Sequence, residues 1–169
     1  MGGDTKTTAN TMTNKALQAT LDKLSGQRAY LDTNCLIFFF DNKEPYFSVV
    51  AELVRACDKG QFFGFTGDVA VADLMVHPYR TRNAAEIARG KAFFNRKNFI
   101  TVLGHSAEVF DTASRLRATQ NLKLIDALHY ATAHHAGCTY FITHDKDFNA
   151  VESREGLEVI RLSDLVSQH

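Results

Sequence analysis

Short apolar runs alternate along this chain with longer segments of helical periodicity, and this alternation restricts the fold more than any other feature. We expect strands at Arg28–Leu31, Phe62–Thr66, Phe99–Leu103, Cys138–Thr143 and Leu157–Ile160. We expect helices at Phe47–Lys59, Asp68–Val76, Asn83–Asn95, Ser106–Thr119 and Leu124–Ala136. Strands joined by helices form right-handed crossovers and a mostly parallel sheet covered on both faces. The sequence therefore predicts a three-layer α/β/α fold of the α/β class, with its site beyond the carboxyl ends of the strands.

The chain divides into three predicted parts. Residues 1–13 are polar and rich in threonine, which predicts a flexible arm because few apolar residues are present to offset the entropy of ordering it. Residues 14–26 are expected to form a helix, since leucines recur there at helical spacing before Gly26. Residues 27–169 are then a single domain, within which Pro78 is expected to end a helix.

Composition and charge exclude several classes of protein. Lys plus Arg and Asp plus Glu both total 19, so net charge gives no long-range attraction to nucleic acid. No run approaches the roughly 18 apolar residues of a membrane helix. Residues 1–15 lack the apolar segment of an export signal, so we expect a cytoplasmic protein. The spacing of Cys35, Cys57 and Cys138 favours buried reduced thiols over a disulfide or zinc pattern.

Two aspartates follow predicted strands. Asp32 comes after Ala29-Tyr30-Leu31, and Asp145 comes shortly after Tyr140-Phe141-Ile142. Both would project from the same edge of a parallel sheet, which is where a site is expected. Asp32 can equally be the cap of a helix that begins near Cys35.

Two more acids lie in predicted helices whose other residues are largely apolar. Asp126 borders the packed stripe of its helix, where it can complement the helix dipole or contribute to a site. Asp73 is one charge inside an apolar segment, so it needs a cation, water, or a salt bridge to Arg80 or Arg82. Asp68, at the start of the same segment, is expected to be an N-cap.

The set of acids is more informative than any one of them. Carboxylates that converge on one edge repel one another, and a hard divalent cation such as Mg²⁺ or Mn²⁺ relieves that repulsion with oxygen ligands. The chemistry that such a site favours is metal-assisted phosphodiester hydrolysis. The candidate catalytic and metal-binding residues are Asp32, Asp73, Asp126 and Asp145.

These residues, in this order, resemble the PIN-domain family. The matching fragments are Tyr30–Asn34, Phe65–Gly67 with Ala72–Leu74, Leu124–Ala133 and Phe141–Phe148. The resemblance covers about Ala29 to Val166. Each fragment alone has low specificity, whereas four in order at the expected spacing are specific.

The resemblance implies an endoribonuclease that uses one or two Mg²⁺ or Mn²⁺ ions, similar to the VapC toxins of toxin–antitoxin pairs. It implies that the four candidate aspartates bind metal, that Asn34 and Thr143 orient ligands or water, and that Asp147 is an outer acid. Such toxins usually form homodimers, are silenced by an antitoxin whose tail enters the acidic groove, and cut structured RNAs, often transfer RNA.

Two positions depart from the family pattern. The second acid is usually Glu, and the shorter Asp73 would reach a metal only through water. The residue before the fourth acid is commonly Asn and here is His144. That histidine could ligate metal or contact phosphate, but we favour simple exposure.

A local excess of positive charge offsets the neutral total. Residues 80–97 contain six basic side chains against the single acid Glu86, which makes RNA contacts or an ordinary solvated helix face equally good interpretations. Arg89 and Arg96 would share a helix face if the helix extends that far. The candidate RNA contacts are Arg80, Arg82, Arg89, Arg96 and Lys97.

The other histidines and a run of aromatic residues receive structural interpretations. His129, His134 and His135 lack the spacing of a helical zinc pair, so we expect surface or packing roles. Residues 38–40, all phenylalanine, are expected in the core or at a dimer contact.

Two alternatives to a nuclease follow from the same residues. A PIN-like module that binds RNA or protein without cleaving it is compatible with Asp73 in place of the longer acid. An aspartyl phosphotransferase is disfavoured, since no Asp-x-Asp follows the first strand and no glycine-rich phosphate loop is present.

Overall fold

Five parallel strands form one sheet at the centre of the chain, with the order β3-β2-β1-β4-β5. The computed structural model describes the backbone of residues 5–151 and 156–166 and the side chains of residues 15–151 and 156–166. The strands are β1 (Arg28–Leu31), β2 (Phe63–Gly67), β3 (Thr101–Leu103), β4 (Tyr140–Thr143) and β5 (Glu158–Arg161). The α/β class and the mostly parallel sheet expected from the sequence are confirmed.

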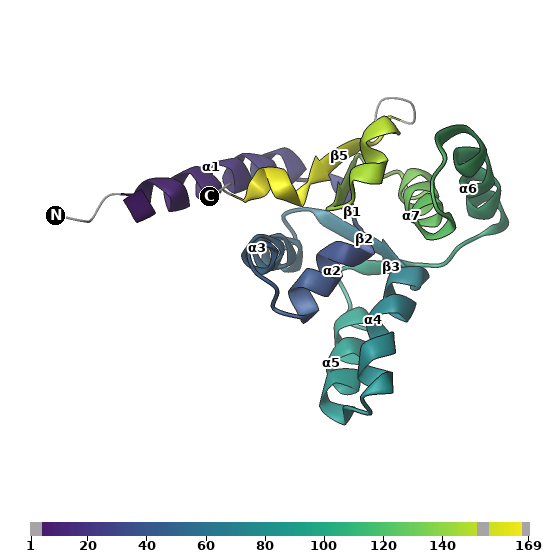
Figure 1. The fold of residues 1–169 in the computed structure, drawn as a ribbon, viewed down its shortest axis with the longest axis horizontal. Coiled ribbons are helices and arrows are strands. Elements are labelled where there is room, and N and C mark those ends of the chain that lie inside the picture. The colour runs from purple at the N-terminus through teal and green to yellow at the C-terminus, as the bar shows by residue number, and fades with distance from the viewer. Residues whose placement is uncertain (1–4, 152–155, 167–169) are drawn as a thin grey trace.

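Helices join the strands in pairs and cover both faces of the sheet (Figure 1). They are α1 (Thr5–Leu24), α2 (Thr33–Phe40), α3 (Tyr46–Asp58), α4 (Asp68–Arg80), α5 (Ala84–Phe94), α6 (Ala107–Gln120) and α7 (Leu124–His135). Two 3-10 turns, η1 (Lys146–Ala150) and η2 (Leu162–Leu165), flank β5 in the sequence. Among the described residues, no helix combines the length and apolar content that crossing a membrane requires.

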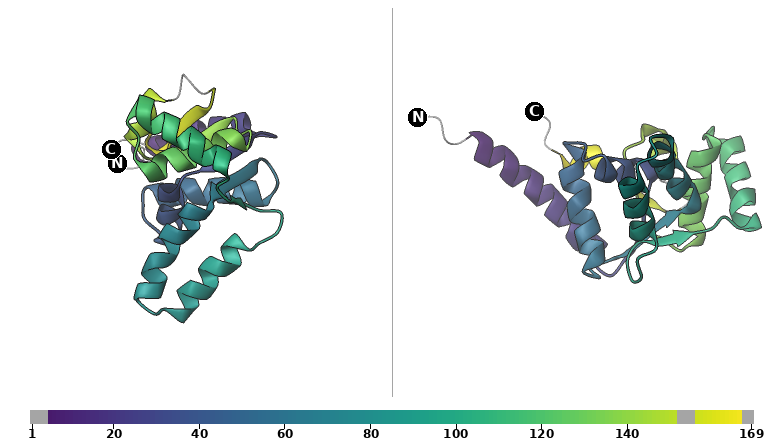
Figure 2. Two further views of the ribbon diagram at one scale, coloured as in Figure 1. Left: turned by 90° about the vertical axis from the view of Figure 1, so that its right-hand side faces the viewer. Right: turned by 90° about the horizontal axis from the view of Figure 1, so that it is seen from below.

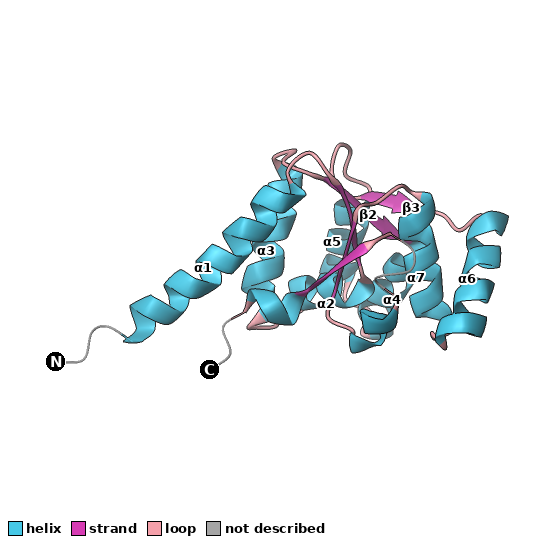
Figure 3. Cartoon of the chain, turned by 90° about the horizontal axis from the view of Figure 1, so that it is seen from above, coloured by secondary structure: helices cyan, strands magenta, loops and turns pink. Residues whose placement is uncertain are grey.

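The alternation of side chains along β1 and β4 divides the core into two clusters. Ala29, Leu31 and Ile142 point into the cluster formed with α1, α2 and α3. Tyr30 and Phe141 point to the opposite face, where they pack with α6, α7 and η1. Figure 3 shows the resulting helix layers on the two sides of the strands. These layers confirm the predicted three-layer arrangement.

Helices α4 and α5 form a hairpin that projects from the body of the domain (Figure 2). They approach closely at Gly90, where an added Cβ would lie 2.7 Å from the Met75 sulfur. The prediction that Pro78 ends α4 near Val76 is wrong, because the helix runs through Pro78 to Arg80. A proline removes one backbone donor but leaves later ones intact, and here the Thr81 N–H donates to the His77 carbonyl at 3.0 Å.

The N-terminal helix is longer than the sequence predicts. Its packed end matches the expectation, since Leu17, Leu21 and Leu24 are buried. Its start is corrected from residue 14 to Thr5, so most of the predicted arm is helical, while residues 1–4 lie outside the described residues. Once a packed end nucleates a helix, each further residue adds one hydrogen bond, which permits extension through a polar segment.

Several smaller predictions have clear outcomes. Cys35, Cys57 and Cys138 are buried free thiols, as expected. The edge strand β3 begins at Thr101 rather than at Phe99, because Phe99 turns into the core before the strand starts. The phenylalanines of residues 38–40 lie in α2, where the first two pack against the core and the third against α5.

Candidate functional site

The candidate site lies where the direction of winding through the sheet reverses. From β1 the chain moves outward to β2 and β3, and it then returns to place β4 on the other side of β1. In open parallel sheets, such a reversal leaves a crevice at the carboxyl ends of the two central strands. Asp32 directly follows β1 and Asp145 follows β4, so both acids lie at this crevice.

Asp32 is buried at the end of β1 and caps α2. Its Oδ1 accepts a hydrogen bond from the Thr33 N–H at 2.8 Å, which confirms the capping role. Only 3% of the residue is exposed. Burial raises the pKa of Asp32 to about 6, with a smaller contribution from the charge of Asp145, although hydrogen bonds from Thr143 and Thr33 oppose the shift. The aspartate is therefore both a helix cap and a destabilised charge.

Two polar side chains connect the loops that follow β1 and β4. The Thr143 hydroxyl donates to Asp32 Oδ2 at 2.7 Å and accepts from the Asp145 N–H at 3.0 Å. The Asn34 amide donates to Asp32 Oδ2 at 3.3 Å, and its Oδ1 accepts from the His144 N–H at 3.1 Å. These contacts fix the position of Asp32 relative to the chain segment that carries Asp145.

Three further carboxylates gather beside Asp32. Asp126, Asp145 and Asp147 each offer an oxygen, and these oxygens lie within 4.8 Å of one another. Asp126 is in the first turn of α7, as expected, while Asp145 accepts the Asp147 N–H at 2.9 Å and caps η1. Burial raises the pKa of Asp126 to about 6, and the charges of Asp145, Asp32 and Asp147 add to the shift.

The described residues supply little positive charge to this group of acids. Among the described residues, the one ion pair that involves any of these four acids is between Asp32 Oδ1 and His129 Nε2, at 3.8 Å. Burial lowers the pKa of His129 to about 4, so this ring is neutral at pH 7. Lys123 slightly lowers the pKa of Asp126 from a distance. An all-oxygen set of mutually repelling donors fits a hard divalent cation such as Mg²⁺ or Mn²⁺.

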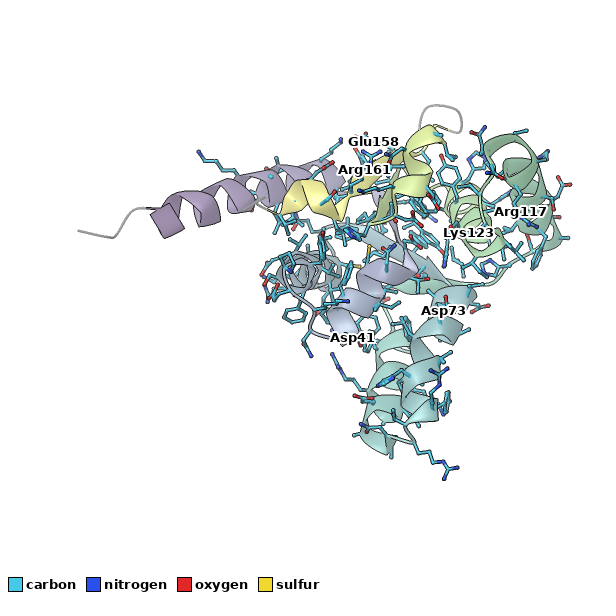
Figure 4. The ribbon with its side chains drawn as sticks, viewed as in Figure 1. Asp41, Asp73, Arg117, Lys123, Glu158 and Arg161 are labelled. Carbon is cyan, nitrogen blue, oxygen red and sulfur yellow. The ribbon has the colours of Figure 1, made fainter. Side chains whose placement is uncertain are left out.

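Asp73 stands apart from these acids. It is exposed on α4 and does not belong to the group of close carboxylate oxygens (Figure 4). Its charge still acts on His129, whose pKa it raises slightly against the larger effect of burial. The described residues contain no salt bridge from Asp73 to Arg80 or Arg82. Asp68, expected to cap α4, is instead its first residue, and Gly67 is the N-cap.

Two histidines near the acids have surroundings that the sequence does not reveal. The expectation that His144 is simply exposed is wrong, because its ring is half-buried with centroids 4.4 Å from Tyr46 and 5.3 Å from Phe38. His129 is buried and hydrogen-bonded to Tyr30 and Thr33, a packing role that extends to the site. The sequence did hold one indication that His129 lies near the site: it is three residues from Asp126 on one helix, and residues at that spacing are neighbours on the helix surface.

The predicted RNA contacts are spread over the α4–α5 hairpin and the segment after it. Arg89 donates to the Phe40 carbonyl at 3.3 Å, and Arg96 forms a salt bridge with Asp58. Arg96 lies beyond the end of α5, so the shared helix face is not present. Arg80, Arg82 and Lys97 are exposed.

A separate cavity of about 540 Å³ lies between α2 and the hairpin. Phe40, Met75 and Phe94 form part of its lining, together with Arg89 and Glu86. None of the close carboxylates lines it. The cavity is therefore distinct from the acidic crevice.

Residues 29–153 match the PIN domain family. Comparison with curated protein sequences gives no match. Several solved structures share the fold. A toxin–antitoxin complex from Klebsiella pneumoniae superposes with a TM-score of 0.59 and 22% identity, covering 79% of this chain and 97% of that chain.

Two further structures give the same TM-score at lower identity. One is VapBC2 from Rickettsia felis bound to a DNA fragment from its promoter, with a TM-score of 0.59 and 13% identity, covering 79% of this chain and 98% of that chain. The other is VapC20 from Mycobacterium tuberculosis, a sarcin-ricin loop cleaving toxin, with a TM-score of 0.59 and 13% identity, covering 73% of this chain and 94% of that chain. At these identities the similarity is one of fold.

Proposed function

This chain belongs to the PIN domain family, and we propose that it is a metal-dependent endoribonuclease that acts as the toxin of a toxin–antitoxin pair. The observation that carries the proposal is the convergence of Asp32, Asp126, Asp145 and Asp147 at the reversal point of the sheet. Acids held so close together, with little compensating charge among the described residues, are costly unless they bind a cation.

Each acid has a proposed part in this activity. Asp32, Asp126, Asp145 and Asp147 would hold one or two divalent cations, and the exposed Asp73 would reach them through water. A cation bound there lowers the pKa of a water molecule and stabilises the charge on the departing oxygen. The hydroxyl of Thr143 and the amide of Asn34 hold Asp32 in a fixed position relative to the loop after β4.

The proposed partners come from the family and from the related structures. The similar VapC20 structure is that of a toxin that cleaves the sarcin-ricin loop, and the similar structure from Klebsiella pneumoniae is a toxin–antitoxin complex. For this chain we accordingly propose a structured RNA substrate, with transfer RNA as one candidate. An antitoxin that covers the acidic crevice, a homodimeric state and a cytoplasmic location complete the proposal.

Metal-titrated RNA cleavage by the full chain tests the activity. Protein treated with EDTA is incubated with labelled structured RNA while Mn²⁺ or Mg²⁺ is added, and product is expected only with the cation. Asp126→Asn should abolish product, because it removes one anionic ligand and leaves the helix nearly isosteric. Asp111→Asn is the matched control, since Asp111 is an exposed aspartate on α6 paired with Arg115. Cleavage by Asp126→Asn at the wild-type rate would contradict the proposal.

One observation favours a second candidate. Asp73 is exposed and outside the group of close oxygens, so one of the four aspartates that the sequence pattern predicts as metal ligands does not lie with the others. A PIN-like module that binds RNA or protein without cleaving it would tolerate this arrangement. In the same assay, that candidate predicts RNA binding with no product at any cation concentration.

A further inference from the structure

One buried histidine connects three elements at the acidic crevice. The Nδ1 of His129, on α7, lies 2.7 Å from the hydroxyl of Tyr30 on β1. Its Nε2 lies 2.7 Å from the hydroxyl of Thr33 at the start of α2. Only 1% of His129 is exposed. Both ring nitrogens are therefore engaged inside the protein.

The connected elements are those that carry two of the acids. Asp126 precedes His129 by three residues on α7, so the two side chains share a face of that helix. On the other side, Thr33 directly follows Asp32 and donates its N–H to Asp32 Oδ1. The imidazole thus lies between the helix of Asp126 and the strand end of Asp32.

The hydrogen-bond pattern selects one arrangement of the ring proton. His129 Nε2 lies 3.8 Å from Asp32 Oδ1. A hydrogen on Nε2 presents its positive end to that carboxylate, whereas a bare Nε2 would present an acceptor to it. With the hydrogen on Nε2, the Tyr30 hydroxyl donates to Nδ1, and Nε2 donates to the Thr33 hydroxyl.

A role in packing alone does not account for this residue. An apolar side chain would fill the same space without the cost of burying a polar ring. The cost of the ring is offset only while both hydroxyls are bonded, so Tyr30, His129 and Thr33 act as a unit.

We propose that His129 is a positioning residue of the acidic site, which sets the separation of Asp126 and Asp32 by bonding Tyr30 and Thr33 at the same time. The inference rests on the proposed function, since it assumes that these acids bind a cation. Residues that orient metal ligands commonly change metal affinity about 10- to 100-fold when they are replaced.

The first measurement is the Mn²⁺ dissociation constant of the full chain. The electron paramagnetic resonance signal of free Mn²⁺ reports how much of the cation remains unbound. His129→Leu is expected to bind Mn²⁺ about 10- to 100-fold more weakly than wild type. His129→Gln should recover part of this affinity, because its amide can still donate toward Thr33. His134→Gln is the matched control, an exposed histidine on the same helix, and its affinity should equal that of wild type.

The second measurement reports on the network without any cation. In the metal-free protein, ¹⁵N spectra of the imidazole are expected to show a slowly exchanging hydrogen on Nε2 of His129. Thr33→Val should speed its exchange, and Tyr30→Phe should shift the Nδ1 resonance. These two variants keep the histidine, so they also test the proposal if His129→Leu fails to fold.

The outcomes separate this inference from the proposed nuclease. Wild-type affinity in folded His129→Leu, or an Nδ1–H tautomer in the spectra, would overturn the positioning role alone. A wild-type protein that binds no Mn²⁺ and cleaves no RNA would overturn the nuclease proposal and the positioning role with it. Weaker Mn²⁺ binding in His129→Leu with recovery in His129→Gln would support both.

Discussion

The acidic crevice and the α4–α5 hairpin both concentrate charge, but the protein treats the two kinds of charge differently. At the crevice, four acids from three separate segments of the sequence converge, and hydrogen bonds with Thr143, Asn34 and backbone N–H groups hold Asp32 and Asp145 in place. By contrast, Arg80, Arg89 and Lys91 come from one stretch of sequence and lie on the α4–α5 hairpin, which projects from the body of the domain (Figure 2). Proximity in the fold, rather than density in the sequence, therefore identifies the site.

The hairpin and the segment that follows it also use part of their positive charge within the protein. Arg89 lies 4.9 Å from the centre of the Phe40 ring and donates to the Phe40 carbonyl, while Arg96 pairs with Asp58. No comparable compensation reaches the acids from the described residues. The acids therefore remain available to an outside cation, whereas Arg89 and Arg96 already stabilise the fold.

The largest expected contrast between the two regions is in catalysis. Asp32→Asn keeps the helix cap but removes a charge from the crevice, and we expect RNA cleavage to fall by about 1,000-fold. Arg96→Ala should leave the rate within about twofold, because an exposed salt bridge contributes little. Single-turnover rates with saturating Mn²⁺ provide the comparison. Equal losses in both variants would show that the two regions do not differ in this way.

A change of pH should weaken cation binding at the crevice. The pKa values of Asp32 and Asp126 are both raised to about 6 in the metal-free protein. Cations bind the deprotonated carboxylates, so protons compete as the pH falls through 6. Between pH 7.5 and pH 5.5 we expect Mn²⁺ affinity to fall by about tenfold, as measured by calorimetry. An affinity that is constant over this range would contradict the raised pKa values.

Removal of one charge should stabilise the metal-free protein. The folded-state pKa of Asp126 lies above its ordinary value of 3.8, so its ionised form destabilises the fold above pH 6 and no longer does so below about pH 4. In EDTA at pH 7, Asp126→Asn should therefore raise the free energy of unfolding by about 1 kcal/mol, discounted for the partial exposure of the residue.

Urea unfolding under two further conditions checks whether the ionised Asp126 causes this destabilisation. At pH 4 the difference between Asp126→Asn and wild type should vanish, since the repulsion is lost once the wild-type carboxyl is protonated in the folded state. With saturating Mn²⁺ at pH 7, the order should reverse because the cation stabilises the wild type. A variant that is less stable than wild type in EDTA would mean that its helix-dipole contribution exceeds the repulsion.

The smallest expected effect concerns the exposed end of the hairpin. Arg80→Ala and Arg82→Ala together should raise the KM for RNA by about two- to threefold and reduce its dependence on salt. The value of kcat should not change, because neither residue lies at the crevice. A loss in kcat would instead place the tip of the hairpin at the reacting phosphate.

The positions of the acids at the crevice can be predicted from the sequence because they depend on short-range patterns. Asp32 and Asp145 follow apolar strands, and parallel strands deliver their carboxyl ends to one edge whatever the loops do. The place of Asp126 beside a packed helical stripe follows from the period of 3.6 residues in its own segment. The helix pairs and the buried thiols follow from the same short-range patterns.

Other features depend on contacts between distant elements and escape such rules. His144 packs between Phe38 and Tyr46, which are remote in sequence from it and are brought there by α2 and α3. Asp73 illustrates the reverse case, since an apolar sequence context suggests burial and the fold leaves the residue exposed.

The hydrogen bonds that Asp32 accepts limit how many of its lone pairs remain free to bind a cation. A carboxylate has about four lone pairs, and three hydrogen bonds to Asp32 already occupy one on Oδ1 and two on Oδ2. Only Oδ1 retains an open lone pair. Asp32 would thus bind a cation through one oxygen only, and binding through both oxygens would first require the Asn34 hydrogen bond, the longest of the three, to break.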